Sequence, residues 1–433
     1  MKSLATVLLA LSLLGGCAAD ATGSTNMTPA QPATCGNKGV ICSYLGNGEA
    51  GLGDDGVPPL EVSLYLPQDL TFGPDDRPYV ADWNNHRIRT IVDGKVQTLI
   101  GIGEVGDVMD GPALTVSLNH PTHVSFDDQG RLILSAWHNS KVMRYDPHTK
   151  LLTTLCGTGK RDYGGDDGPA LKAVLDLPTA TAFDLDGNML IMDQGNQRIR
   201  RVDQNDMITT IIGPNKRFEP VPDGMQQVCA TDPMSGAETC KLCLPAEASD
   251  PMCTAHKPQG FIGDGGPADQ SLMYQRYGQS ADPEGRMEMG DDGTLYFADT
   301  GNNRVRAVGT DGIIRTVAGS GPDHFDTTFK GGYDGDGGPA TSALLKNPVD
   351  VAVGKKGAIY IADTQNSCVR KVDAGGVITT LAGKCEKRGF AGDGGPAKSA
   401  LLDRPYGVAL DKHGNLYIAD THNQRIRVVY GVE

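Results

Sequence analysis

Five ionisable side chains stand at fixed offsets from a landmark that recurs along the chain. The landmark is a proline, replaced once by glutamate, that lies fifteen residues before a repeated aspartate position. The second residue after it is Asp69, His123, Arg286 or Asp350 in four of the six copies, and Glu288 is the fourth residue after it in one copy. Such a collection could bind a cation or a polar ligand, or perform acid–base chemistry. It could equally form structural salt bridges, for example between Arg286 and Asp350.

A second set of candidate ligand-binding residues is aromatic. Both tryptophans of the chain, Trp83 and Trp137, occupy the same column of neighbouring repeats, and His138 follows the second. That repeat is also the most divergent, with Ala136 and Met143 in place of aspartate and arginine. An exposed pair of tryptophans would suit a sugar or peptide ligand. Ordinary packing between repeats is the alternative.

These residues belong to a repeat of about 57 residues. The phrase Ala-Asp-Trp-Asn-Asn-His-Arg-Ile-Arg, which begins at Ala81, occurs six times with variations, and a Gly-Asp-Gly-Gly-Pro-Ala type of segment precedes each copy. The longest interval equals one repeat plus an insertion, which we place near residues 214–260. The repeated aspartate position is occupied by Asp82, Ala136, Asp193, Asp299, Asp363 and Asp420.

Each repeat contains four short β-type runs separated by turn residues. In the fifth repeat they read VDVAV, AIYIAD, CVRKVD and VITTLAG. This pattern is typical of a four-stranded antiparallel meander. A single meander cannot bury its faces, so the repeats must pack on one another, and radial packing of such blades gives a β-propeller.

The repeated Asp-x-x-Asn-x-Arg-Ile-Arg wording resembles the NHL repeat family over residues 40–430. The resemblance implies an all-β, six-bladed propeller of four-stranded antiparallel blades. The sixth repeat stops after its third strand, whereas residues 40–46 stand where a fourth strand belongs. We therefore predict that this N-terminal strand completes the last blade and removes an exposed edge.

The repeated polar residues have a structural interpretation and a metal-binding one. A short aspartate or asparagine side chain can hydrogen-bond its own turn, and six copies favour a shared folding role. The Gly-Asp-Gly-Gly-Pro-Ala segments offer carboxylates and carbonyls that suit calcium. Each segment has only one or two carboxylates, however, and Pro-Ala after Gly-Gly is typical of the first turn of a short helix.

Ten cysteines in an exported chain favour disulfides. Cys368 begins the third strand of its repeat and Cys385 follows the fourth, so antiparallel pairing would bring them together. Cys35 and Cys42 are close enough to form a local loop, and Cys156 is expected to be a buried free thiol. The insertion holds four more: Cys229, Cys240, Cys243 and Cys253. Their pairing stays open, with a zinc site as the alternative.

The first 16 residues have the features of an export signal. Lys2 precedes an apolar run too short to span a bilayer, and the run ends Leu-Gly-Gly-Cys17, which resembles a bacterial lipobox. We expect Cys17 to carry lipid, residues 17–39 to form a flexible tether and residues 40–433 to form the propeller. This places the chain in the cell envelope, with the outer membrane favoured. An ordinary cleaved signal is the alternative.

Strand order assigns the variable loops to one side of the propeller. The Asp-x-x-Asn turns, the connectors into each first strand, the insertion and residues 320–332 share this side, here called the loop-rich face. Function usually resides on such loops. We therefore expect a monomeric, lipid-anchored module that binds a protein, peptide or saccharide at the cell envelope.

Composition and motifs restrict the other functions. The chain has 39 basic and 53 acidic residues, a formal net charge of −14, which opposes the nucleic-acid binding of some NHL proteins. It contains no nucleophile elbow, P-loop or HExxH motif. The alternative to a binding module is a metal-dependent lyase or hydrolase at the mouth of the central channel. The resemblance includes the peptide-amidating lyase, whose zinc site needs several histidines, and only His123 falls in an inner column here.

Overall fold

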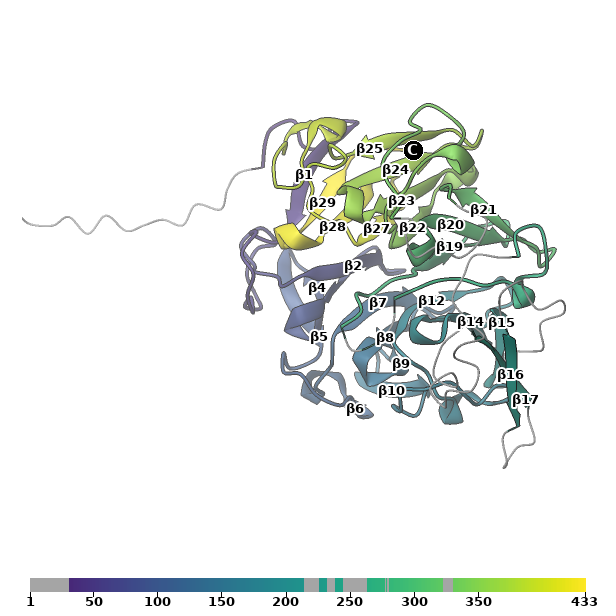
Figure 1. The fold of residues 1–433 in the computed structure, drawn as a ribbon. Helices are drawn as coiled ribbons and strands as arrows, with labels where there is room; N and C mark the ends of the chain where they lie inside the picture. The colour runs from purple at the N-terminus through teal and green to yellow at the C-terminus, as the bar shows by residue number, and fades with distance from the viewer. Residues whose placement is uncertain are drawn as a thin grey trace, which may run out of the picture. The chain divides into compact units, whose positions relative to one another are not determined.

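Six antiparallel sheets surround a central axis in the described part of the chain (Figure 1). The computed structural model describes residues 31–213, 226–231, 238–243, 263–276, 278, 280–321 and 330–433. Residues Gln31–Glu433 form one compact unit. The all-β six-bladed propeller predicted from the sequence is confirmed. Within the described ranges, no helix is long and apolar enough to cross a bilayer.

Five blades contribute their four main strands in the order of the chain, from the axis outward, and the sixth takes its fourth strand from the start of the described chain. The innermost strands are β2 (Pro67–Phe72), β7 (Pro121–Phe126), β12 (Pro178–Phe183), β18 (Met287–Met289), β22 (Asp350–Val353) and β27 (Gly407–Leu410). The second strands are β3 (Pro78–Asp82), β8 (Leu132–Ala136), β13 (Met189–Asp193), β19 (Leu295–Asp299), β23 (Ile359–Asp363) and β28 (Leu416–Asp420).

The outer half of each blade follows the same order. The third strands are β4 (Arg87–Val92), β9 (Lys141–Tyr145), β14 (Arg198–Val202), β20 (Arg304–Val308), β24 (Cys368–Val372) and β29 (Arg425–Val429). The fourth strands are β5 (Lys95–Ile100), β10 (Leu151–Cys156), β15 (Met207–Ile212), β21 (Ile314–Ala318), β25 (Ile378–Ala382) and β1 (Val40–Leu45). Three two-residue strands, β6 (Gly111–Pro112), β11 (Gly168–Pro169) and β26 (Gly395–Pro396), extend three of the outer edges.

Short 3-10 helices occupy the repeated turns and connectors. Between the second and third strands lie η1 (Trp83–Asn85), η3 (Trp137–Asn139), η5 (Gln194–Asn196), η8 (Thr300–Asn302), η11 (Thr364–Asn366) and η13 (Thr421–Asn423). The Pro-Ala connectors lead into η2 (Ala113–Thr115), η4 (Ala170–Lys172), η7 (Ala268–Gln270), η9 (Ala340–Ser342) and η12 (Ala397–Ser399). One more, η10 (Lys355–Gly357), lies in the turn after β22. The connector helices agree with the turn interpretation of these segments.

The ring is closed by the N-terminal strand. β1 pairs antiparallel with β29, with Ile41 opposite Val429 and Cys42 opposite Val428. Figure 1 shows the purple β1 beside the yellow β29. The predicted closure is therefore confirmed, and the last blade is joined from both ends of the described chain.

The apolar core is divided into six layers, one between each pair of neighbouring blades. In β23, Ile359 and Ile361 face the blade before, whereas Tyr360 and Ala362 face the blade after. Successive side chains of a strand point to opposite faces, so burial of both faces requires an unbroken apolar run. This explains the AIYIA type of sequence in every second strand.

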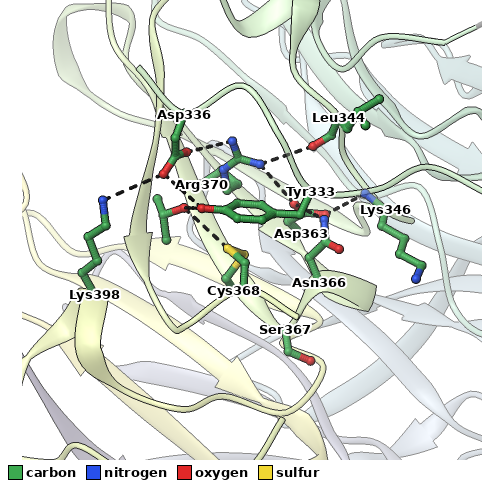
Figure 2. Close-up of a disulfide and its surroundings, with 12 residues drawn as sticks. Tyr333, Asp336, Leu344, Lys346, Asp363, Asn366, Ser367, Cys368, Arg370 and Lys398 are labelled. Atoms are coloured by element: carbon green, nitrogen blue, oxygen red, sulfur yellow. Dashed lines mark hydrogen bonds and ion pairs between the residues drawn. A yellow bond between two sulfur atoms is a disulfide. The ribbon is translucent and has the colours of Figure 1, made fainter. Parts of the chain in front are cut away.

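A buried arginine joins the repeated turn to the glycine-rich segment, as Figure 2 shows for blade five. The Arg370 side chain is 0% exposed, and its Nη1 lies 3.5 Å from Asp363 Oδ2. Its Nη2 donates to Asp336 Oδ1 at 2.8 Å. Asn366 Nδ2 donates to Asp363 Oδ2 at 2.8 Å. A guanidinium is tolerated in the interior because two carboxylates compensate its charge.

The same arrangement recurs in four other blades. The pairs are Arg89 with Asp82 and Asp55, Arg200 with Asp193 and Asp166, Arg306 with Asp299 and Asp264, and Arg427 with Asp420 and Asp393. Blade two has Ala136 and Met143 at these positions, and its Lys141 Nζ donates to the Val108 carbonyl at 2.9 Å. The repeated aspartates thus serve folding. Across the described ranges, no three His, Cys, Asp or Glu side chains are grouped to hold a metal ion.

Two disulfides fasten the described propeller. Cys35 is joined to Cys42 in β1, and Cys368 at the start of β24 is joined to Cys385 after β25. Both are the pairs that the sequence favours. Cys156 is a buried free thiol. The insertion contains a two-stranded sheet of β16 (Gln226–Thr231) and β17 (Glu238–Cys243).

Three sequence-based predictions lie outside the described part of the chain. The signal and Cys17 belong to the undescribed first 30 residues. The side chains of Cys229, Cys240, Cys243 and Cys253 are likewise not described.

The buried pair in blade five predicts strong non-additivity. Arg370→Met removes the cation from two carboxylates and should lower the free energy of unfolding by about 3–5 kcal/mol. Asp363→Ala with Arg370→Met copies the residues of blade two and should cost less than the sum of the two single changes. Urea denaturation of the four proteins measures both effects. Additive losses would contradict the ion-pair argument.

Candidate functional site

Arg286 crosses the central channel and closes it toward the loop-rich face. It precedes β18 of blade four, and the whole residue is 0% exposed. Its Nη1 donates to the carbonyl of Gln68 at 2.6 Å and to that of Tyr406 at 3.0 Å. Its Nη2 donates to the Thr122 carbonyl at 3.0 Å. One side chain thereby connects blade four to blades six, one and two.

Two carboxylates balance this guanidinium. Arg286 Nη1 lies 3.7 Å from Asp69 Oδ1 and 3.7 Å from Asp350 Oδ2. The positions of Asp69, Arg286 and Asp350 therefore agree with the salt bridges that the sequence suggested as one interpretation. Gly407 provides the necessary space, because a Cβ atom there would lie 3.0 Å from Arg286 Nη1 and 2.7 Å from the Gln68 carbonyl oxygen.

The other polar side chains of the inner strands connect each blade to the next. Asp69 Oδ2 accepts the Val124 N–H at 3.2 Å, and Asp350 Oδ2 accepts the Val408 N–H at 2.8 Å. Glu288 Oε2 accepts the Val353 N–H at 2.8 Å, and His123 Nδ1 accepts the Thr181 N–H at 3.4 Å. The structure thus brings all five predicted channel residues together, and each of them holds the ring as well as facing the axis.

Burial shifts the pKa values of these groups toward their neutral forms. Burial, together with the neighbouring Asp350 carboxylate, raises the pKa of Glu288 to about 8. Burial also raises the pKa of Asp350, although Arg286 opposes this. Burial lowers the pKa of His123 to about 4, with Asp69 opposing, so the imidazole is neutral at neutral pH. The channel therefore holds its excess acidic groups partly as neutral acids.

A cavity of about 340 Å³ lies in the channel beyond Arg286. Asp69, His123, Glu288 and Asp350 line it together with the later residues of the inner strands. Because these strands start at the loop-rich face, the cavity lies toward the opposite face, where the tight turns are. Its apolar lining includes Phe72, Phe126, Phe183, Met289, Val351 and Leu410.

The tryptophan column forms a separate cluster on the loop-rich face. Trp137 is 1% exposed and its Nε1 donates to Gln194 Oε1 at 3.0 Å. Its ring stacks on His138 with centroids 4.1 Å apart, and it lies 6.2 Å from the half-buried Trp83. One tryptophan therefore packs between blades, and only Trp83 reaches the surface.

The sequence reasoning missed two histidines that complete this cluster. His120 lies 4.3 Å from Trp83 between ring centroids, and its backbone N–H donates to His86 Nδ1 at 3.2 Å. His120 Nδ1 also lies 3.2 Å from His138 Nδ1. Burial lowers the pKa of His120 to about 3 and that of His138 to about 4, so both rings are neutral at neutral pH. The sequence did contain one clue to its position, because His120 directly precedes the landmark proline of the second repeat.

The fold and these sites define a repeat-built β-propeller with a plugged central channel and an aromatic loop face. The family model of the teneurin NHL domain matches residues 53–232 and 314–390, and the NHL repeat model matches residues 402–429. The chain therefore belongs to the teneurin NHL domain family.

Curated relatives are distant and longer than this chain. Teneurin-1 of Mus musculus is 25% identical over 425 residues, which cover 90% of this chain and 13% of the relative. NHL repeat-containing protein 2 of Homo sapiens is 24% identical over 384 residues, which cover 87% of this chain and 47% of the relative. The chain thus spans less than half the length of either relative.

Solved structures share the fold. A protein of unknown function from Bacteroides thetaiotaomicron superposes with a TM-score of 0.58 at 17% identity, covering 90% of this chain and 75% of the other. An auxiliary nutrient binding protein from the same organism gives a TM-score of 0.57 at 14% identity, with the same coverage. At these identities the likeness extends to the fold alone.

Removal of the Arg286 guanidinium should destabilise the propeller. Arg286→Ala leaves the Asp69 and Asp350 carboxylates without their cation, and we expect a loss of about 3–5 kcal/mol in the free energy of unfolding. Arg286→Lys should restore only part of this, because one ammonium cannot reproduce the planar fork that reaches three carbonyls. Urea denaturation gives both values.

The matched control is Arg315→Ala on the surface. Arg315 pairs with Asp311, and their side chains are 52% and 51% exposed. We expect its loss to cost less than about 0.5 kcal/mol. Equal effects at the two positions would refute a special role for the Arg286 plug.

Proposed function

We propose that this chain is an exported, lipid-anchored propeller that binds a ligand or protein through its loop-rich face. The lipobox-like Leu-Gly-Gly-Cys17 and the small polar residues after it support anchoring at the cell envelope. The auxiliary nutrient binding protein with the same fold is consistent with a binding role. The partner is a protein, peptide or saccharide.

The aromatic and imidazole cluster is the observation that carries this proposal. Trp83, Asn84, His86, His120 and His138 are all half-buried and come from neighbouring blades. Flat rings beside amide groups offer stacking surfaces and hydrogen bonds in one place. Because they lie where the chain departs from its repeat, packing of the blades does not require these residue types. In blade five, for example, the residue at the Trp83 position is Thr364.

The alternative, a metal-dependent enzyme in the channel, has weaker support. Among the six inner strands, His123 is the only histidine, and its Nδ1 already accepts the Thr181 N–H. Arg286 also blocks the channel on the side of the variable loops.

The lipid anchor has a direct test. Cells expressing the full chain are labelled with palmitate, and the wild type should incorporate the label whereas Cys17→Ser should not. Membrane fractionation should then release the variant from the envelope fraction, because the thioether-linked lipid is its proposed attachment. Undiminished labelling of Cys17→Ser would end the lipoprotein proposal.

The binding face can be tested through the two tryptophans, which are the only ones in the chain and both lie in the cluster. The mature protein is screened against oligosaccharide and peptide arrays, and each hit is titrated by tryptophan emission. We expect hits to change the emission and His86→Ala to weaken them at least tenfold, because His86 borders Trp83 and His120.

The control for this screen is His413→Ala. His413 lies in the turn between β27 and β28 on the opposite face, and its side chain is 65% exposed. This variant should bind like the wild type. Hits that leave the emission unchanged and depend on His413 would assign binding to the other face.

A further inference from the structure

The channel cavity is a built compartment of ligand size. Its volume of about 340 Å³ falls within the range of small-molecule sites. Arg286 closes the end toward the loop-rich face through its bonds to the carbonyls of Gln68, Thr122 and Tyr406. Half-buried Phe72 and Phe126 stand toward the other end. A ligand would therefore enter from the tight-turn face.

Polar groups inside the cavity have bonding capacity that the described chain does not use. The Asp69 side chain is 4% exposed, and among the described residues its Oδ1 has only the Arg286 contact at 3.7 Å. His123 Nδ1 accepts the Thr181 N–H, so the neutral ring carries its proton on Nε2. That nitrogen lies 3.9 Å from Asp69 Oδ2, too far for a hydrogen bond. A carboxylate oxygen and an imidazole N–H thus face the cavity, and neither has a hydrogen-bond partner among the described residues.

The cavity also has an excess of acidic groups. The inner strands contribute Asp69 from β2, His123 from β7, Glu288 from β18 and Asp350 from β22, whereas β12 and β27 contribute no ionisable side chain. Arg286 is the cation at its closed end, and Asp291 in the turn after β18 adds another negative charge. Three carboxyl groups therefore face one guanidinium and a neutral imidazole.

We propose that the channel cavity binds a small organic ammonium compound against its acidic wall, to which Asp69, Glu288 and Asp350 contribute. An ammonium group supplies hydrogen-bond donors and the missing positive charge together. The apolar part of the ligand lies between the phenylalanine rings, whose faces also attract cations. The mixed apolar wall and the lack of a metal-holding group in the described ranges favour an organic cation over an inorganic one. This site is separate from the loop-rich face.

Binding at this site is coupled to proton release. Burial raises the pKa of Glu288 to about 8, with Asp350, Asp291 and Asp69 adding to the rise and the Val353 N–H opposing it. Glu288 is therefore largely protonated at neutral pH. A bound ammonium stabilises the carboxylate and expels its proton. The affinity consequently rises as pH increases toward the pKa of Glu288 in the empty cavity and levels off above it.

Isothermal titration calorimetry of the mature protein tests the proposal with phenethylamine. Titrations at neutral pH in phosphate and in MOPS, a zwitterionic buffer with a different ionisation enthalpy, give the number of protons released. We expect saturable binding with release of about one proton. The uncharged 2-phenylethanol and the anionic phenylacetate should bind at least tenfold more weakly, and the tryptophan emission should not change, because the tryptophans lie on the other face.

Two buried glutamates provide the variant and its control. Glu288→Gln keeps an acceptor for the Val353 N–H but removes the charge, so phenethylamine binding should weaken at least tenfold and proton release should fall by the share that Glu288 supplies. Burial also raises the pKa of Glu284, to about 7, but Glu284 does not line the cavity. Glu284→Gln should leave affinity and proton release unchanged, and thermal melting confirms that both variants are folded.

Several results would overturn the proposal. They are an absence of heat with phenethylamine at millimolar concentration, equal affinity for 2-phenylethanol, and unchanged affinity and proton release in folded Glu288→Gln. Saturable binding of calcium chloride that Glu288→Gln abolishes would assign the cavity to an inorganic cation instead. None of these results affects the loop-face proposal, which tryptophan emission tests independently.

Discussion

The structure depends on a buried arginine held between two aspartates in five of its six blades. Removal of a guanidinium from water is costly, so the fold is stable only when the turn aspartate and the connector aspartate both reach it. The arginine thereby fixes the third strand, the turn before that strand and the connector relative to one another. Strand order places the loops of all six blades on one face, and in these five blades the ion pair holds the turn and the connector of that face together.

The axis imposes a different constraint, because six strands meet there and little space is left around Arg286. Arg286 uses the space left by Gly407 on the opposite side of the ring. Its bonds to blades six, one and two complement the backbone pairing of β1 with β29. The propeller is thus held at its rim by strand closure and at its centre by one guanidinium. The plug also separates the two faces of the channel.

The repeat predicted the parts of the molecule that recur. Six blades, the closing strand at residues 40–46 and the convergence of Asp69, His123 and Arg286 all follow from a period and fixed offsets. The cluster on the loop-rich face was only half predicted. His86 comes from a turn and His120 from a connector, so no column of the repeat aligns them, and their contact arises only when blades one and two pack together. The sequence left the burial of Trp137 open between packing and ligand binding, since its Gln194 partner belongs to the next blade.

Burial changes the protonation of ionisable groups both on the loop-rich face and in the channel cavity. On the loop-rich face the imidazoles stay neutral because desolvation and mutual repulsion lower their pKa values. In the cavity the carboxyl groups outnumber the guanidinium, and a proton on Glu288 lowers the negative charge at neutral pH. An empty cavity is therefore compatible with a stable ring, because protons supply the positive charge that a ligand would bring. A cation can replace a proton there without breaking the bonds of Arg286, since these bonds go mainly to backbone carbonyls. The channel can thus be filled or empty while the blades keep their places.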